Sequence, residues 1–169
     1  MNETVLKIFR ESFENLVSKG KLPSLPKILP KKLMAPNGGV YAAAFEKIGR
    51  NPRGRVGNYM PLKPTLADEI QYQAKNLSES FPFRREDLPF LTYELLLTQS
   101  PHFLTDIHDL NPYNGLLIKT RTKTAVSLPL KESESKRRFK EACIRAQIDY
   151  KSEEIRLYEF PIEIIQESK

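Results

Sequence analysis

The residues best suited to chemistry lie in one short segment, "RNPRGRVGNYMPLKP", which runs from Arg50 to Pro64. Arg53 and Arg55 are two residues apart, a spacing that places both side chains on the same face of an extended segment. Two guanidinium groups on one face suit a phosphate or a carboxylate, which they can hold through paired hydrogen bonds. The segment therefore predicts a site for an anion or another polar ligand.

The neighbours of the two arginines favour the same interpretation. Glycine lets a ligand or a second backbone approach closely, so Gly54 and Gly57 are expected to give access to the site. The predicted ligand-binding residues are Tyr41, Arg53, Gly54, Arg55, Gly57, Asn58 and Tyr59. An alternative interpretation is structural: the two glycines shape a bulge, and Arg53 pairs with a buried acid.

The remaining reactive side chains give weaker signals. His102 and His108 are the only histidines, and their spacing fits neither one helix face nor the common zinc patterns, so a surface loop is favoured over a metal or acid–base site. Cys143 is expected on the apolar face of a helix, where a free cysteine acts as a small hydrophobe. The sequence assigns no catalytic residue, metal or cofactor, and whether the protein is an enzyme stays open.

The charge of the chain bears on its partners. Twenty-seven basic and 21 acidic residues give a net charge of +6, which can attract nucleic acid or another anion. The densest basic run is "KESESKRRFK", with Lys136, Arg137, Arg138 and Lys140, and glutamates lie at helical spacing beside it. A solvated, salt-bridged start of a helix is favoured over a nucleic-acid patch. "PNGG" at residues 36–39 lacks the lysine of a phosphate-binding loop and is interpreted as a turn.

Length and composition indicate one globular domain. The 169 residues are 40% hydrophobic and 28% charged, and the longest apolar runs are too short for a membrane span. A single cysteine excludes an internal disulfide, and no secretory signal is visible, so a cytoplasmic location is expected. The pattern does not decide between a monomer and a homodimer.

Helices and strands are mixed along the chain. The first half predicts a helix over residues 1–20, a proline-rich extended arm over 21–37 that packs on the body through Leu22, Leu25, Ile28 and Leu29, and a strand over 40–48. Gly20 is expected to end the first helix. After a turn at 50–54, the partner strand "VGNYM" completes a hairpin, and Thr65 caps a helix with a buried stripe of Leu66, Ile70, Ala74 and Leu77. The second half predicts strands at 90–99, 115–121, 124–128 and 155–165, and a helix at 134–148. Without regular alternation of strand and helix, this order indicates an α+β fold.

The motifs, in order, resemble the AMMECR family. They are "PNGGVYAAAF", "RGRVGNYMP", "PTLADEI", "FPF", "YELLLTQSP", "NGLLIKTRTKTAVSLP", "FKEACIRAQI" and "IRLYEF", spread over residues 36–163. The resemblance implies an α+β domain built on an antiparallel sheet flanked by helices, with a cleft beside the glycine-bracketed motif. It also implies a possible link to Memo-like or radical S-adenosylmethionine partners, and hence an enzymatic or accessory role as an alternative to simple binding.

The chain departs from the family signature, Leu-Arg-Gly-Cys-Ile-Gly, in one chemically important place. Arg53, Gly54 and Gly57 match it, while Arg55 replaces the cysteine. A thiolate step is therefore not available at this position. Three functions follow as hypotheses: a module that binds a small anion or a protein partner, an enzyme, and a nucleic-acid-binding protein.

Overall fold

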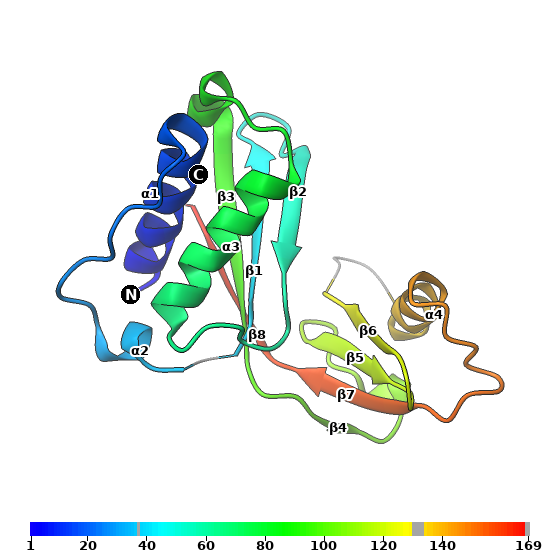
Figure 1. The fold of residues 1–169 in the computed structure, drawn as a ribbon. Helices are drawn as coiled ribbons and strands as arrows, with labels where there is room; N and C mark the ends of the chain where they lie inside the picture. Colours follow the sequence, from blue (N-terminus) through cyan, green and yellow to red (C-terminus); the bar gives the residue numbers. More distant parts are fainter. Residues whose placement is uncertain (37, 130–133, 168–169) are drawn as a thin grey trace. The chain divides into compact units, whose positions relative to one another are not determined.

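The structure is a computed structural model that describes residues 1–36, 38–129 and 134–167. Helices accompany two antiparallel sheets, which confirms the predicted α+β class (Figure 1). The elements are α1 (Asn2–Lys19), α2 (Lys31–Met34), β1 (Val40–Glu46), β2 (Pro52–Gly57), α3 (Leu66–Ser80), η1 (Arg85–Phe90), β3 (Leu91–Thr98), β4 (His102–Leu104), η2 (Ile107–Asp109), β5 (Gly115–Lys119), β6 (Thr124–Ser127), α4 (Ser135–Arg145), β7 (Arg156–Phe160) and β8 (Ile162–Gln166).

The chain divides into two compact units where the sequence predicts one domain. Unit 1 comprises Met1–Thr98 and Glu163–Lys169, and unit 2 comprises Gln99–Ile162. Each unit has a four-stranded sheet and a hydrophobic core. Composition and length do not reveal this division, because two small cores and one larger core need similar numbers of apolar residues.

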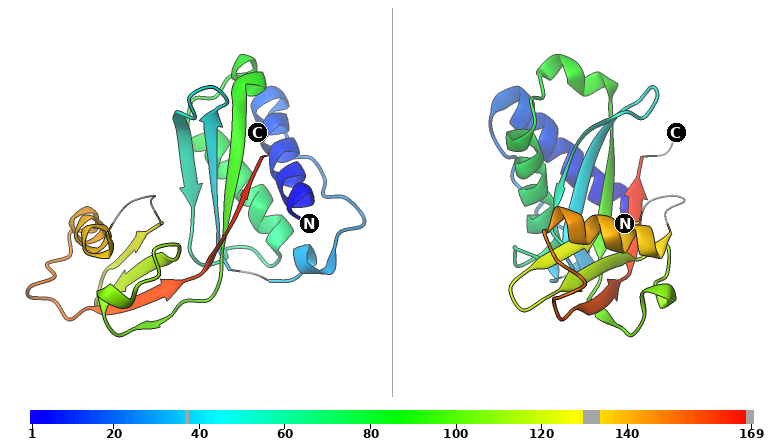
Figure 2. Two further views of the ribbon diagram at one scale, coloured as in Figure 1. Left: turned by 180° about the vertical axis from the view of Figure 1, so that it is seen from behind. Right: turned by 90° about the vertical axis from the view of Figure 1, so that its right-hand side faces the viewer.

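Unit 1 is a sheet in the order β2-β1-β3-β8 with helices on one face. Figure 2, in its view from behind, shows the strands in front of α1 and α3. Alternate strand residues such as Ala42 and Leu95 enter the core with Phe9 and Ile70 from the helices. The helices therefore cover the face of the sheet that carries these residues. Three other strand residues, Ala43, Arg55 and Glu94, do not belong to this core.

The helix signals in the first half are confirmed. Helix α1 ends at Gly20, whose φ of 65° is left-handed and whose N–H donates to the Leu16 carbonyl. Helix α3 begins after Thr65, whose side chain accepts a hydrogen bond from the Asp68 N–H. Its buried stripe of Leu66, Ile70, Ala74 and Leu77 is as predicted.

The proline-rich arm packs on unit 1 through fewer residues than expected. Leu25 and Leu29 pack against the core, and the short helix α2 buries Leu33. Ile28 is 91% exposed, so the expectation that it packs on the body is wrong. Prolines prevent a regular helix or strand here, so the direction of one side chain does not fix the direction of the next, and Ile28 can point outward while Leu29 packs inward.

The hairpin forms as predicted, but its turn lies earlier in the chain. Gly49 and Arg50 have φ values of 77° and 50°, which mark the turn between β1 and β2. Strand β2 begins at Pro52, so the residues predicted as the turn lie largely on a strand. The register shifts between Ala44 and Phe45, a β-bulge.

Unit 2 is a sheet in the order β4-β7-β5-β6, with α4 on one face. Ala142 and Cys143 of α4 pack against Leu116 and Ile118 of β5. Two features differ from the prediction. Strand β4 occupies a predicted loop, and the predicted strand at 155–165 is divided at Pro161 into β7 and β8, which belong to different sheets.

Two features are absent from the described residues. No helix has both the length and the apolar content needed to cross a bilayer. Within the same residues, no group of three or more His, Cys, Asp and Glu side chains is placed to hold a metal ion.

Candidate functional site

Arg55 is engaged by an acid of the same sheet. Its guanidinium lies 3.2 Å from Glu94 Oε1, and the Arg50 guanidinium lies 3.5 Å from Glu94 Oε2. Ala43 on β1 is in register with both Arg55 and Glu94, so its small side chain separates the two charged residues on one face. The carboxylate therefore occupies the position in which a bound anion was expected.

Arg53 turns to a different set of partners. It is the extra residue of the bulge, since Ala44 pairs with Gly54 and Phe45 pairs with Pro52. Its guanidinium lies 3.5 Å from Glu46 and 3.6 Å from Asp87 of η1, and 6.0 Å from the ring centroid of Phe83.

The prediction that Arg53 and Arg55 share one face and grip one anion is not supported by this geometry. A bulge interrupts the alternation of side chains on which the prediction rests. The structural alternative describes the arrangement better, although the acids that hold Arg53 are only partly buried.

The two glycines of the motif serve packing rather than access. A Cβ on Gly54 would lie 2.7 Å from the ring of Phe81, which belongs to the residues packed on the core. Gly57 has a φ of 147°, and a Cβ there would lie 2.4 Å from the Cα of Tyr41. Side chains and backbone of the protein already fill the space that these glycines leave.

The remaining predicted residues lie on the β1–β2 edge of the sheet. Asn58 donates its backbone N–H to the Val40 carbonyl, and the Tyr59 carbonyl accepts from the Thr98 hydroxyl at 2.8 Å. Burial raises the pKa of Tyr41 to about 12, and the charge of Tyr59 adds to this shift. The Tyr41 phenol therefore stays protonated at neutral pH.

A cavity of about 410 Å³ lies beside Arg53. Its lining residues are Glu46, Lys47, Ile48, Arg53, Asp87 and Phe90. Ile48 and Phe90 are 87% and 67% exposed, although both are large and apolar. We call this feature the Arg53 cavity; its volume falls in the range typical of small-molecule sites, roughly 300–1,000 Å³.

Hydrogen bonds hold the two sides of the Arg53 cavity together. The backbone N–H of Lys47 donates to the Phe90 carbonyl at 2.8 Å, and its ammonium donates to the Pro89 carbonyl at 2.7 Å. The β1–β2 turn is thus fastened to the end of η1. Ile48 and Phe90 consequently project from two fixed backbone segments.

The charges of the Arg53 cavity balance. Lys47 and Arg53 contribute two positive charges, and Glu46 and Asp87 contribute two negative ones. The ion pairs of Arg53, at 3.5 and 3.6 Å, are longer than direct hydrogen bonds, so guanidinium donors remain for another acceptor. The site can offer donors and acceptors to one polar group beside an apolar wall.

Sequence reasoning placed Arg53 near the site and missed its apolar part. Ile48 lies in a turn beside Gly49, and Phe90 follows a proline at the end of η1. Large apolar residues in turns are a signal that was available in the sequence. That both flank one cavity follows only from the fold.

The other candidates are not brought together. The ring of His102, in β4, lies 2.9 Å from the carboxylate of Glu159, in β7. His108 lies in η2, where its backbone N–H donates to the Asp106 carboxylate. Cys143 is buried in the core of unit 2, as predicted, and burial raises the pKa of its thiol.

The predicted solvated basic cluster needs one correction. Lys136, Arg137 and Lys140 are exposed, but Arg138 is 1% exposed and points inward. Glu132, which the sequence places beside this cluster, lies outside the described residues.

Comparison with known proteins supports the fold. No family model matches the chain. A protein of Thermotoga maritima is 25% identical over 157 residues, covering 89% of this chain and 90% of that protein. The crystal structure of an uncharacterised protein from Pyrococcus horikoshii matches with a TM-score of 0.81 at 20% identity, covering 96% of this chain and 89% of that chain.

Proposed function

We propose that the protein is a binding module and that the Arg53 cavity holds a small neutral ligand, or the equivalent group of a partner polypeptide. The observation that carries the proposal is the pair of exposed side chains, Ile48 and Phe90, fixed on either side of a cavity that contains Arg53. Large apolar side chains exposed beside a hollow commonly mark a contact surface.

Charge decides between a neutral and an anionic ligand. An anion would gain from Arg53 and Lys47 but would meet Glu46 and Asp87 within the same lining. An amide has both a donor and an acceptor, so it can use the guanidinium and a carboxylate together. The ligand we propose therefore has an apolar body and an amide-like polar group.

The test is a titration of the ¹⁵N-labelled protein with N-acetyl-phenylalaninamide, followed by amide chemical shifts. We expect saturable shifts at Lys47, Ile48, Arg53 and Phe90. Ile48→Asp should weaken the binding at least tenfold, since a carboxylate at the rim is poorly compatible with an apolar group. Inorganic phosphate should produce no saturable shift at the same residues.

The matched control is Ile28→Asp. Ile28 is also exposed, but it lies on the proline-rich arm and not in the lining of the Arg53 cavity. This variant carries the same change in charge and should bind like the wild type. Equal weakening in both variants, or no saturable shift with the amide at all, would reject the proposal.

The family resemblance, the cytoplasmic location and the choice between monomer and homodimer remain part of the proposal. Membership of the AMMECR family rests on the order of the eight sequence motifs, and the location rests on the lone cysteine. An enzymatic role with Memo-like or radical S-adenosylmethionine partners is the second candidate and rests on the same resemblance. The Arg53 cavity supports simple binding directly, whereas the enzymatic role rests on the resemblance alone, so binding is the better supported of the two.

A further inference from the structure

The face of the unit 2 sheet opposite α4 carries an unusual combination of side chains. Leu116, Ile118 and Leu157 face the core beneath α4. Because side chains alternate along a strand, Phe103, Lys119, Arg156 and Tyr158 belong to the other face. The same alternation places Leu117 and Phe160 on this face, and both are buried, so the exposed part is the region of the four residues named above. It is separate from the Arg53 cavity, which lies in unit 1.

Strand pairing arranges these residues in two adjacent rows. Phe103 of β4 pairs with Tyr158 of β7, which makes an aromatic row. Arg156 of β7 pairs with Lys119 of β5, which makes a basic row. Arg156 and Tyr158 are two residues apart on one strand, so the rows are about 7 Å apart.

The two rows are in contact with one another. The rings of Phe103 and Tyr158 meet edge to face, with centroids 5.8 Å apart, and the Lys119 ammonium lies 5.7 Å from the Tyr158 centroid. Phe103 is nevertheless 63% exposed. An aromatic surface remains available for stacking beside the cations.

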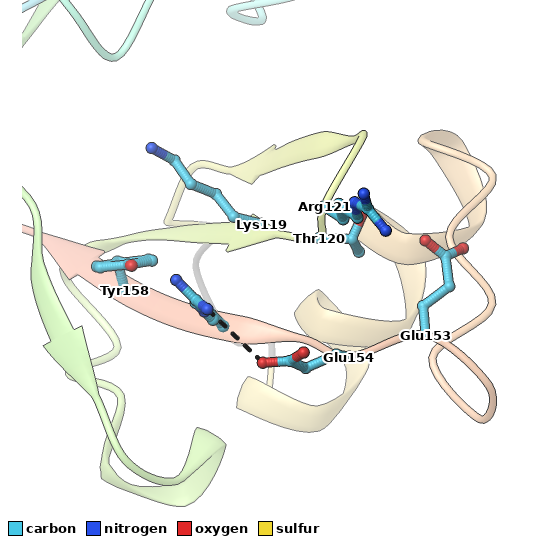
Figure 3. A pocket seen from close by; sticks show the side chains of 7 residues that line it. Lys119, Thr120, Arg121, Glu153, Glu154 and Tyr158 are labelled. Carbon is cyan, nitrogen blue, oxygen red and sulfur yellow. Dashed lines mark ion pairs between the residues drawn. The ribbon is translucent and has the colours of Figure 1, made fainter.

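A cavity of about 760 Å³ extends this surface, and Figure 3 shows Lys119, Arg121 and Tyr158 around it. Two acids also line it. Glu153 is held by Lys123 at 3.3 Å, and Glu154 makes a 3.7 Å pair with Arg156 in which both side chains are mostly exposed. Arg121 has no acidic partner among the residues that the structure describes.

We propose that this aromatic and basic surface of unit 2 binds single-stranded nucleic acid. A nucleotide joins a planar base to a phosphate, and the two rows present groups for both. Exposed bases stack on aromatic rings of a sheet, while lysine and arginine follow the backbone. A purely anionic polymer would use the basic row and leave Phe103 without a role.

The first measurement is the anisotropy of a fluorescein-labelled oligothymidylate with the full chain. If Lys119, Arg121 and Arg156 each contact one phosphate, raising the salt from about 50 to about 200 mM should weaken binding about twentyfold. In Lys119→Gln/Arg156→Gln only one of these contacts remains, and the same salt change should weaken binding only about threefold.

Two further variants separate this surface from net charge. Lys136→Gln/Lys140→Gln removes the same number of charges from exposed positions on α4 and should retain the wild-type salt dependence. Phe103→Ser should bind about fivefold more weakly or worse, with an unchanged salt dependence, because only stacking is lost.

Each opposite result would overturn the inference. The first two are the absence of binding at the lowest salt and an equal loss of salt dependence in the two double variants. The third is unchanged binding by Phe103→Ser. The fourth is displacement of the labelled oligonucleotide by a polyglutamate peptide of equal charge as readily as by unlabelled oligonucleotide. The last result would identify a general polyanion surface. None of them affects the Arg53 cavity, because its test uses a neutral amide.

Discussion

At the scale of single residues, Gly54 leaves a space that the ring of Phe81 fills. Arg55 and Arg53 are likewise used within the protein, by Glu94 on one side and by Glu46 and Asp87 on the other. The most conspicuous motif of the sequence is thus chiefly structural. The binding site that we propose lies beside it, in the cavity that Arg53 lines.

Gly54→Ala tests the packing role. We expect a loss of about 1–3 kcal/mol in the free energy of unfolding, since the new methyl group would overlap the Phe81 ring. Urea unfolding of Gly54→Ala, Phe81→Ala and the double variant measures the coupling, and the double variant should lose less than the sum. Additive effects would show that the two side chains do not compete for this space.

Arg138 is a second residue whose role depends on burial. It donates hydrogen bonds to the Asn114 carbonyl at 2.7 Å, the Ser127 carbonyl at 3.0 Å and the Pro112 carbonyl at 3.3 Å. Burial lowers its pKa, and these oxygens compensate the charge, since no acid among the described residues pairs with it. The arginine thereby fastens the turn before β5 to the end of β6.

Arg138→Met should therefore destabilise the protein by about 3 kcal/mol, because the carbonyls of Pro112, Asn114 and Ser127 lose a charged donor. Arg137→Met is the matched control, since Arg137 is exposed and its acidic partner among the described residues is Glu141 on the same helix. It should leave the urea midpoint almost unchanged. Equal midpoints for the two variants would contradict the structural role of Arg138.

At the scale of elements, the sequence predicts helices and strands better than it predicts their pairing. The capping signal at Thr65 and the stop at Gly20 are local, and both are confirmed. Pro161 breaks a continuous apolar run because it lacks a backbone donor, but only the fold reveals that β7 and β8 join different sheets. The sequence also does not predict the bulge at Arg53, because a bulge depends on the register with the partner strand.

Strands β4 and β7 are connected by a network around Glu159. Burial acts to raise the pKa of Glu159, but hydrogen bonds from Asn114, His102 and Asn111 outweigh it and hold the pKa below its ordinary value. A folded pKa below the unfolded one stabilises the protein fully above the unfolded pKa, and this stabilisation is lost as the pH falls through the folded pKa.

Glu159→Gln should accordingly be less stable than the wild type at neutral pH. The difference should shrink at about pH 3.5, below the ordinary glutamate pKa of about 4.3. Urea unfolding at both pH values measures this difference in the free energy of unfolding. Asp149 and Glu153 also have lowered pKa values, but both proteins retain these groups, so their effect does not change the difference. A difference that grows toward acid would contradict the network.

At the scale of the whole molecule, two cores replace the one that the sequence predicts. Phe9, Ile70 and Leu95 belong to one, and Ile118 and Cys143 belong to the other. Helical spacing predicted that Ile70 and Cys143 are buried. Which core each one joins depends on contacts between distant segments, and no local pattern encodes them.

The two cores predict separate local stabilities. In native-state hydrogen exchange, Arg138→Met should accelerate the amides of β5, such as Ile118, and leave those of β1, such as Ala42, unchanged. The wild type recorded under the same conditions is the reference. Equal acceleration in both strands would show that the units unfold as one.

The most direct test of the central claim is a crystal structure of the protein soaked in N-acetyl-phenylalaninamide. We expect the phenyl ring between Ile48 and Phe90, the amide within hydrogen-bond distance of Arg53, and Arg55 still paired with Glu94. Amide density absent from the Arg53 cavity, or Arg53 and Arg55 turned together onto a ligand with their acids displaced, would contradict it.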